Sequence, residues 1–193
     1  MKKIEMNGKT YFTHPCTAAY FGGDVDCRAS AFLVFHIADN GENEQHVIYE
    51  WEKCGTTADE LAKYLENHET EKAVLETVDL HFSSKLEELP DNLKVGRNLR
   101  VNFAKMKKLP KNLYVGGNLD LCDTIITEIP SDIFVGGSID LSMSKVEKLP
   151  NNLKVCGDLD LTLSKVSTLP ENLTVEGSLI LRSTDIAELP ENL

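Results

Sequence analysis

Two carboxylates and a thiol lie close together in residues 22–27, where the chain reads Gly-Gly-Asp-Val-Asp-Cys. Asp24, Asp26 and Cys27 are residue types that can serve as acid, base and nucleophile. No serine or histidine nearby completes a nucleophile motif, and the chain contains no Walker loop, dinucleotide fingerprint or zincin helix. We therefore expect a loop in this stretch, no catalytic residue and no bound cofactor.

Two histidines lie in neighbouring segments that are rich in β-forming residues, 31–38 and 45–52. The Asp-Asn-Gly-Glu-Asn stretch between them is typical of a hairpin loop. Symmetric pairing of the two strands would place His36 opposite His46, near Glu50. Two imidazoles and a carboxylate can bind a divalent metal, but the spacing matches no established metal motif. We expect a solvated strand edge here and no metal site.

The cysteines do not fit a recognisable framework. None of them forms a Cys-x-x-Cys pair, and an odd number with irregular spacing argues against both disulfides and a zinc site. We expect reduced, partly buried thiols. The five cysteines are Cys16, Cys27, Cys54, Cys122 and Cys156.

The net charge of −11 is concentrated in the N-terminal part of the chain. Residues 1–88 contain 17 acidic and 8 basic residues, a balance of −9, whereas residues 89–193 contain 14 and 12, a balance of −2. Such a surface opposes direct nucleic-acid binding, which needs clustered cations, and attracts a partner with a basic surface. No apolar run is long enough to span a bilayer, and the basic start lacks the apolar segment of a signal peptide. These features predict a cytoplasmic protein without membrane contact.

A motif of the form Leu-Pro-x-Asn-Leu recurs every 20 residues along the second half of the chain. In the second unit, Leu113 alternates with Val115 and Leu119 with Leu121, which predicts two short strands that each bury one face. The glycines between the two strands predict a tight turn with positive φ. The proline of each motif excludes a helix at that point. The motif begins at Leu89, Leu109, Ile129, Leu149, Leu169 and Leu189.

Residues 119–130 and 159–170 resemble the leucine-rich-repeat segment LxLxxNxLxxLP. The chain is therefore similar to a short, 20-residue leucine-rich repeat of bacterial or phage-like type. The resemblance implies a solenoid with a parallel sheet on its concave face, which commonly binds another protein, and a unit too short for a convex helix. The asparagine that is usual in the family is replaced, so its hydrogen-bonding ladder is absent and hydroxyl groups can supply only part of it. The replacing residues are Ala104, Thr124, Ser144, Ser164 and Thr184.

Residues 1–70 do not follow the repeat and predict a small α+β module that caps the open end of the solenoid. An Asn-Gly pair at 7–8 predicts a hairpin between strands at 2–6 and 9–12. A capping box predicts a helix over 57–67. The predicted division is 1–70 for the module and 71–193 for the solenoid, with an irregular first repeat over 71–88, five full repeats over 89–188 and a partial sixth over 189–193.

The residue between the two leucines of each unit points away from the core. Three of these residues are aspartates, which would stack about 4.8 Å apart, and like charges directly opposite one another destabilise a sheet. The acidic column therefore suits the cations of a partner, although repeat duplication of a soluble residue gives the same pattern. A metal is not expected, because one column lacks the converging ligands that calcium requires. The column consists of Arg100, Asp120, Asp140, Asp160 and Ile180.

Two apolar groups are further candidates for partner binding. Phe103, Met143 and Leu163 share one repeat position near the concave rim, where an apolar stripe suits a binding hot spot. Partial burial against the next turn is the alternative. Tyr114 and Phe134 are neighbouring aromatics on the opposite side and form a second candidate contact patch.

Together these patterns predict a non-catalytic protein–protein interaction module that uses the concave face and the acidic N-terminal surface. An alternative is a small phage or bacterial inhibitor or effector that blocks a basic nucleic-acid-binding protein by charge mimicry. A third hypothesis is an enzyme with its site in the N-terminal module. No polar capping segment follows the last repeat, which leaves three alternatives: the chain is truncated here, Leu189 and Leu193 form a minimal lid, or this end self-associates.

Overall fold

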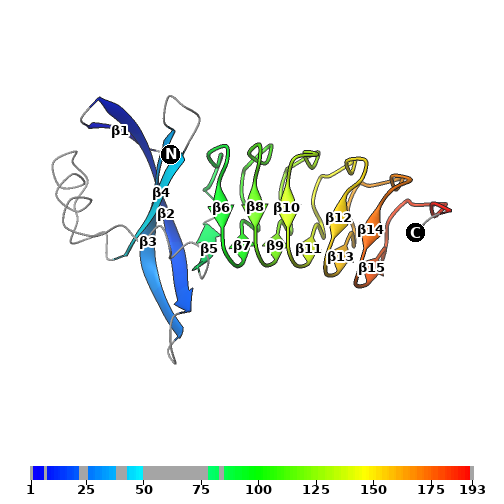
Figure 1. Ribbon diagram of the computed structural model, residues 1–193. Helices are drawn as coiled ribbons and strands as arrows, with labels where there is room; N and C mark the ends of the chain where they lie inside the picture. Colours follow the sequence, from blue (N-terminus) through cyan, green and yellow to red (C-terminus); the bar gives the residue numbers. More distant parts are fainter. Residues whose placement is uncertain are drawn as a thin grey trace.

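The computed structural model describes residues 2–6, 8–21, 26–37, 43–49, 78–82 and 85–191. In this part of the chain, an antiparallel sheet lies at one end of a row of stacked coils (Figure 1). Equivalent residues of successive coils pair in parallel, 20 positions apart. The architecture is therefore a β-solenoid of parallel coils that begins with a β-meander.

The meander has four antiparallel strands. The turn between the first two is short: Met6 pairs with Lys9, and Gly8 has a φ of 74°, a conformation that glycine adopts at little cost. The hairpin predicted at residues 7–8 is thus confirmed. The second and third strands pair along their length, from Tyr11 with His36 as far as Phe21 with Asp26. The strands are β1 (Lys2–Met6), β2 (Lys9–Phe21), β3 (Asp26–Ile37) and β4 (Asn43–Tyr49).

The predicted α+β class of the N-terminal module is wrong. The described residues up to Tyr49 form the meander, and no helix occurs in any part of the chain that the structure describes. Runs of aromatic and aliphatic residues, such as Phe-Leu-Val-Phe-His-Ile at 32–37, favour strands, and each strand finds an antiparallel partner in its neighbour. The helix predicted over 57–67 lies outside the described residues.

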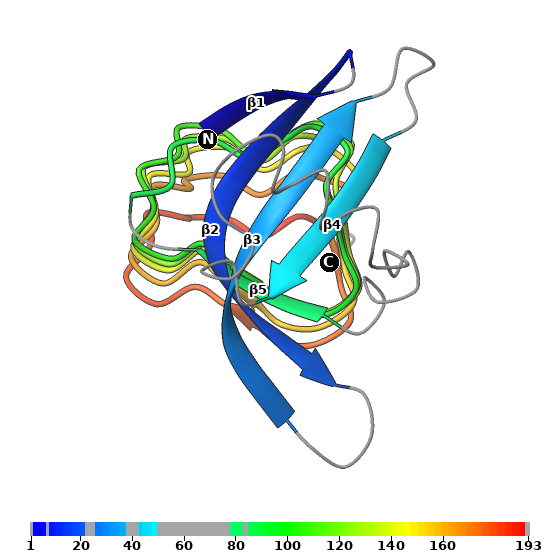
Figure 2. The same cartoon turned by 90° about the vertical axis from the view of Figure 1, so that its left-hand side faces the viewer.

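Strand β2 joins the meander to the solenoid. Its residues Cys16 to Tyr20 pair antiparallel with β5 (Val78–Phe82), and β5 pairs in parallel with β7 (Leu99–Arg100). A ten-stranded sheet therefore runs through the described residues in the order β15-β13-β11-β9-β7-β5-β2-β3-β4, with β1 attached to β2. Figure 2, which looks along the solenoid, shows the meander lying across its end. The edge that β5 would otherwise expose is covered by β2.

From Lys94 onward, each coil contributes two short strands. The second strand of each coil belongs to the ten-stranded sheet, which we call the main sheet, and the first lies on the other side of the coil, in the opposite sheet. The later main-sheet strands are β9 (Leu119–Asp120), β11 (Ile139–Asp140), β13 (Leu159–Asp160) and β15 (Leu179–Ile180). The opposite-sheet strands are β6 (Lys94–Val95), β8 (Tyr114–Val115), β10 (Phe134–Val135), β12 (Lys154–Val155) and β14 (Thr174–Val175).

The opposite sheet is interrupted. Strands β6, β8 and β10 form one ladder and β12 with β14 forms another, so no ladder joins β10 to β12. The main sheet continues between the same two coils, because β11 pairs with β13. At this point the two coils are therefore joined by a strand ladder on one side only, and on the other side Gly157 N–H donates to the carbonyl oxygen of Gly137 at 3.1 Å.

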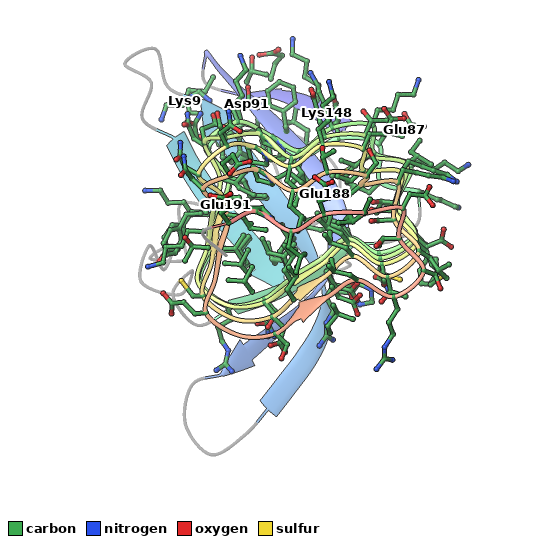
Figure 3. All side chains as sticks on the ribbon, turned by 90° about the vertical axis from the view of Figure 1, so that its right-hand side faces the viewer. Lys9, Glu87, Asp91, Lys148, Glu188 and Glu191 are labelled. Atoms are coloured by element: carbon green, nitrogen blue, oxygen red, sulfur yellow. The ribbon has the colours of Figure 1, made fainter. Side chains whose placement is uncertain are left out.

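Charged side chains stand on the outside of the coils. Seen from the C-terminal end in Figure 3, the labelled Glu87, Asp91, Lys148 and Glu188 lie around the stack, and all four are exposed. Acidic and basic residues are mixed on this outer surface. The solenoid therefore separates a polar exterior from an apolar interior.

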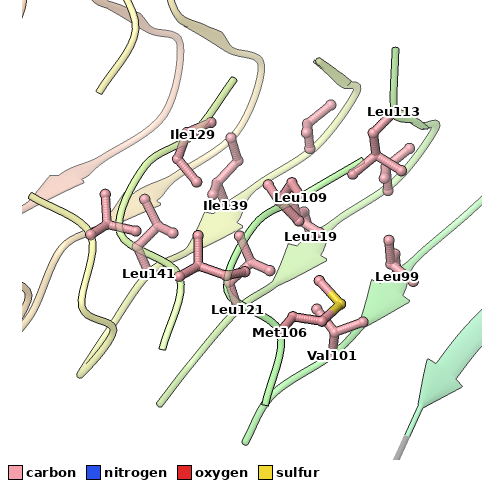
Figure 4. Packing of buried hydrophobic residues seen from close by; sticks show 14 of the residues in the cluster. Leu99, Val101, Met106, Leu109, Leu113, Leu119, Leu121, Ile129, Ile139 and Leu141 are labelled. Atoms are coloured by element: carbon pink, nitrogen blue, oxygen red, sulfur yellow. The ribbon is translucent and has the colours of Figure 1, made fainter. Parts of the chain in front are cut away.

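The interior is a column of leucine, isoleucine and valine side chains that successive coils share (Figure 4). In the second coil Leu113, Val115, Leu119, Leu121 and Ile126 are at most 1% exposed. Burying one such side chain is worth about 1.5–3 kcal/mol, and a single coil could not bury them alone. The apolar positions predicted from the repeat are confirmed as the core.

The glycines between the two strands of a coil serve close packing. Among the described glycines only Gly8 has positive φ, so the predicted positive-φ turn is wrong. A Cβ atom on Gly136 would lie 3.1 Å from the carbonyl carbon of Gly116 in the preceding coil and nearer still to its oxygen. A Cβ on Gly117 would come within 2.6 Å of the side-chain oxygen of Asn98. At Gly117 and Gly136 the preceding coil therefore approaches too closely for a side chain.

Gly136→Ala should therefore destabilise the protein, because the added methyl group meets the backbone of Gly116. We expect the free energy of unfolding in urea to fall by about 1–3 kcal/mol. Cys156→Ala is the matched control, since it occupies the same repeat position and already carries a Cβ. It should change stability by less than about 1 kcal/mol. Equal losses in the two variants would contradict the close-packing explanation.

Candidate protein-binding surfaces

A register column of six residues runs along the outer face of the main sheet. Leu119 and Leu121 are fully buried, whereas Asp120 between them lies on the outer face and is half-buried. Asp120 pairs with Asp140 and Asp140 with Asp160, so the three carboxylates are neighbours. The column has basic residue types toward the meander, acids in the middle and an apolar residue at the far end. It reads His81, Arg100, Asp120, Asp140, Asp160 and Ile180.

Each aspartate of the column also holds the turn that follows its strand. Oδ1 of Asp120 accepts a hydrogen bond at 3.1 Å from the backbone N–H two residues later. Asp140 and Asp160 accept the equivalent bond at 2.8 Å. These Asx turns fix the carboxylates before any partner binds, which lowers the entropy cost of using them in recognition. Sequence reasoning missed this structural role, although an aspartate at the end of a strand is a typical signal for it.

The surroundings of Asp120, the first aspartate of the column, shift its pKa. Burial raises the pKa of Asp120 above its usual 3.8, and the neighbouring Asp140 raises it further. The hydrogen bond from the backbone of Cys122 opposes this shift, as do the charges of Arg100 and His81. A cation placed beside the column would favour the ionised carboxylate and offset both burial and repulsion.

Exposed apolar side chains occupy an unfavourable backbone conformation in three coils. Phe103, Met143 and Leu163 are 54%, 45% and 53% exposed, and their φ angles are 60°, 56° and 58°. Left-handed backbone is rare for bulky residues and better suits Asn, Asp or Gly. Asp123 and Ser183 occupy the same position in two other coils, with φ of 52° and 53°. Folding alone gives no reason for large apolar residues here.

These apolar side chains and the aspartates form one surface. The N–H groups of Phe103, Met143 and Leu163 donate to carbonyl groups of the following coil at 3.0, 2.8 and 2.9 Å, so the backbone beneath them is fixed. Each stands three residues beyond the column and therefore within about 10 Å of it along the chain. We call this the main-sheet surface. It comprises Arg100, Asp120, Asp140, Asp160, Ile180, Phe103, Met143 and Leu163.

A polar ladder ties the coils together just before the main-sheet strands. The side-chain oxygen of Asn98 accepts a hydrogen bond from the backbone N–H of Asn118 at 2.7 Å. The same bond recurs between the next coils at 2.9, 2.9 and 2.7 Å. These side chains are therefore committed to holding the stack. The ladder residues are Asn98, Asn118, Ser138, Asp158 and Ser178.

Hydroxyl groups bond to the backbone at some of the positions 104, 124, 144, 164 and 184. Thr124 and Thr184 donate from Oγ1 to the carbonyl oxygen three residues earlier, at 2.8 and 2.9 Å. Oγ of Ser144 accepts a backbone N–H at 3.4 Å, whereas the buried Oγ of Ser164 has no partner among the described residues. Ala104 has no hydroxyl. At this repeat position, hydroxyl groups therefore bond to the backbone in some coils and not in others.

The opposite sheet carries an exposed aromatic pair. Tyr114 and Phe134 pair in register on β8 and β10 and are 42% and 49% exposed. Their ring centroids are 4.8 Å apart and their planes differ by 10°, a parallel stack along the solenoid. A pocket of about 110 Å³ lies beside Phe134, at the interruption between β10 and β12. This surface is on the other side of the coil from the main sheet.

The structure does not bring the two histidines together. His36 lies opposite Glu44, and His46 pairs two positions away, so the predicted pairing of the histidines is wrong. The reason is that β4 begins at residue 43 instead of 45, which shifts the register by two. The predicted sheet edge is wrong for His36, because β3 lies between β2 and β4, whereas His46 belongs to β4, the last strand of the described sheet. His36 is 7% exposed, with Nδ1 2.8 Å from the carbonyl oxygen of Thr10 and its ring 5.1 Å from Tyr11.

The remaining residues singled out in the N-terminal part are placed as follows. Asp26 and Cys27 belong to strand β3 instead of a loop, and Asp24 and Glu50 lie outside the described residues. Within the described ranges, no three His, Cys, Asp or Glu side chains gather as metal ligands, and no apolar helix of bilayer-spanning length occurs. No protein-family model, curated protein or solved structure matches the chain.

The raised pKa of Asp120 predicts a pH effect on stability. The folded state binds this proton more tightly than the unfolded state, so ionisation of Asp120 makes folding less favourable as the pH rises between 3.8 and the raised pKa. Asp120→Asn keeps an acceptor for the turn and removes the charge. Its melting temperature relative to wild type should be higher at about pH 7 than at about pH 3. An NMR titration that places the pKa of Asp120 at or below 3.8 would contradict the account.

Proposed function

We propose that this chain is a leucine-rich-repeat protein of the short, 20-residue type and that it works as a non-catalytic protein–protein interaction module. The regular LxLxx pattern, the parallel coils and the main sheet fit that family. The main-sheet surface is the proposed binding site. A solenoid of this kind presents fixed rows of side chains to a partner.

The observation that carries the proposal is the left-handed backbone of Phe103, Met143 and Leu163. Each of these residues combines an unfavourable φ with a large exposed apolar side chain. Asp123 and Ser183 demonstrate that polar residues fit the same position. Binding explains the apolar residues. Contact with a partner would bury these side chains and so stabilise the complex, whereas folding alone leaves them exposed.

The chemistry of the main-sheet surface favours a partner with basic and apolar side chains side by side. The three aspartates attract cations and are already fixed by their turns. The apolar residues supply buried area within about 10 Å of these carboxylates. The excess of acidic residues in 1–88 adds a long-range attraction for the same kind of partner.

Removing the charge of the acidic column should weaken binding without disturbing the fold. The triple variant Asp120→Asn, Asp140→Asn, Asp160→Asn keeps the turn acceptors and should raise the Kd at least about tenfold. The measurement is calorimetry with a partner captured from the native host. Glu128→Gln, Glu147→Gln, Glu188→Gln is the matched control, because it removes the same charge from exposed positions outside the surface. Equal Kd changes in both triple variants would remove the column from the binding site.

Stability and binding should move in opposite directions at the apolar positions. Met143→Asn and Leu163→Asn place a residue suited to left-handed backbone, so the free energy of unfolding should be unchanged or higher by up to about 1 kcal/mol. The same variants should weaken partner binding, because they remove the apolar contacts. Urea denaturation and calorimetry on the same samples measure both effects. Variants that bind as tightly as wild type would overturn the proposed role of these side chains.

Salt distinguishes this proposal from charge mimicry of nucleic acid. Binding that depends on buried apolar side chains should persist at physiological ionic strength, where exposed charges are screened beyond about 8 Å. A charge mimic would lose most of its affinity as salt rises from low to physiological concentration. Steep loss of affinity with no effect of Met143→Asn would favour the mimic.

A further inference from the structure

The main-sheet surface repeats at the spacing of the coils, which limits the shape of a partner that can contact all of it. Its carboxylates, on Asp120, Asp140 and Asp160, occupy paired positions in three successive coils. Parallel strands place such positions about 4.8 Å apart, so the three carboxylates span about 10 Å along the solenoid axis. A partner that neutralises all three must present its cations at nearly the same interval.

An α-helix laid along the solenoid axis matches this interval in every coil. Its residues at i, i+3 and i+7 share one face, and the second and third rise about 4.5 and 10.5 Å above the first. Both positions lie within about 1 Å of the corresponding carboxylates. An extended strand repeats each face about every 6.6 Å and is about 4 Å out of place at the third carboxylate. A polyproline helix repeats about every 9.3 Å and therefore leaves Asp140 without a partner.

A second row of side chains, the flanking row, lies beside the carboxylates. In the coils of the three aspartates, a buried core residue and a small, half-buried residue (Cys122, Ser142 or Thr162) separate the two rows. A helix with its side chains is about 10–12 Å wide, so one helix covers both rows. The flanking row is exposed, and it is apolar in three coils and acidic in one. It consists of Phe103, Asp123, Met143, Leu163 and Ser183.

We propose that the protein partner docks an amphipathic α-helix along the solenoid axis, with a row of Lys or Arg on the aspartates and a neighbouring apolar row on Phe103, Met143 and Leu163. This inference rests on the proposed function and specifies the form of the partner. Asp123 interrupts the flanking row, so the apolar row of the helix carries a cation at that coil. Arg100, the next residue of the column toward the meander, repels a further cation and favours an acidic residue of the helix.

The length of the surface and the state of its carboxylates also suit a helix. From Arg100 to Ile180 the column spans four coil intervals, about 19 Å, which corresponds to about 13 residues of α-helix. In each aspartate Oδ1 holds the turn, and Oδ2 is the second acceptor that the carboxylate can offer to a cation. The long, flexible side chains of Lys and Arg absorb the remaining mismatch between helical turns and coils.

The test is a titration of the full ¹⁵N-labelled chain, followed by NMR, with two synthetic peptides of identical composition and about 14 residues. The helical peptide carries lysines at i, i+3 and i+7 and leucines along the neighbouring row, with alanine elsewhere. The control peptide places the same lysines and leucines in strand-like alternation. The helical peptide should cause saturable shifts at the amides of Asp120, Asp140 and Met143 at physiological salt. It should bind at least about tenfold more tightly than the control peptide.

Variants of the chain locate the binding. The triple variant Asp120→Asn, Asp140→Asn, Asp160→Asn should weaken binding of the helical peptide at least about tenfold. Met143→Asn should weaken it at least about threefold, because it removes an apolar contact. The matched control Glu128→Gln, Glu147→Gln, Glu188→Gln should leave the Kd unchanged within about twofold, since these exposed positions lie outside the surface.

Equal binding of the two peptides would overturn the inference, because the surface would then select for charge and not for helical form. The absence of saturable shifts with the helical peptide has the same meaning, as does binding of that peptide that survives the triple aspartate variant. A partner captured from the native host distinguishes these failures from a failure of the proposed function. If that partner loses affinity in the triple aspartate variant while the helical peptide fails, the surface binds a protein in another form.

Discussion

The structure depends on the distance between neighbouring coils. Parallel pairing places equivalent residues about 4.8 Å apart, and the 20-residue register repeats that placement along the solenoid. At this spacing a leucine packs on a leucine, an amide oxygen reaches the next N–H group, and a Cβ in the glycine column meets a carbonyl group. Each column of the repeat must therefore satisfy the same distance in every coil.

This constraint separates columns that maintain the stack from columns that are left for recognition. The apolar core, the polar ladder from Asn98 to Ser178 and the glycines are needed to join one coil to the next. The aspartates belong to both groups, because each holds a turn and also presents a carboxylate. Phe103, Met143 and Leu163 belong only to the second, since their backbone conformation is met more easily by other residues. The surface proposed for binding therefore consists of residues whose side chains are not accounted for, or not fully accounted for, by coil stacking.

Features that recur in every 20-residue unit could be predicted from the sequence, and features that depend on contacts between distant segments could not. The strands and buried positions of the solenoid follow from period-2 alternation in each 20-residue unit, and the column of Asp120, Asp140 and Asp160 follows from the same period. The partner of His36 was not predictable, because a two-residue shift in register leaves the same side chains on each face. The role of Gly136 depends on the approach of another coil, which local turn preferences do not report. The α+β class rested on a local capping pattern, whereas the described module is built by pairing between strands.

The separation of β10 from β12 also has a mechanical consequence. Bending that spreads the coils on the opposite side must break ladder hydrogen bonds between β8 and β10 or between β12 and β14, but none has to be broken between β10 and β12. The shared apolar core, the β11–β13 pair and the hydrogen bond from Gly157 N–H to the carbonyl oxygen of Gly137 still connect the two parts. Among the described coils from β6 to β14, this is the boundary at which the main sheet alone supplies a strand ladder.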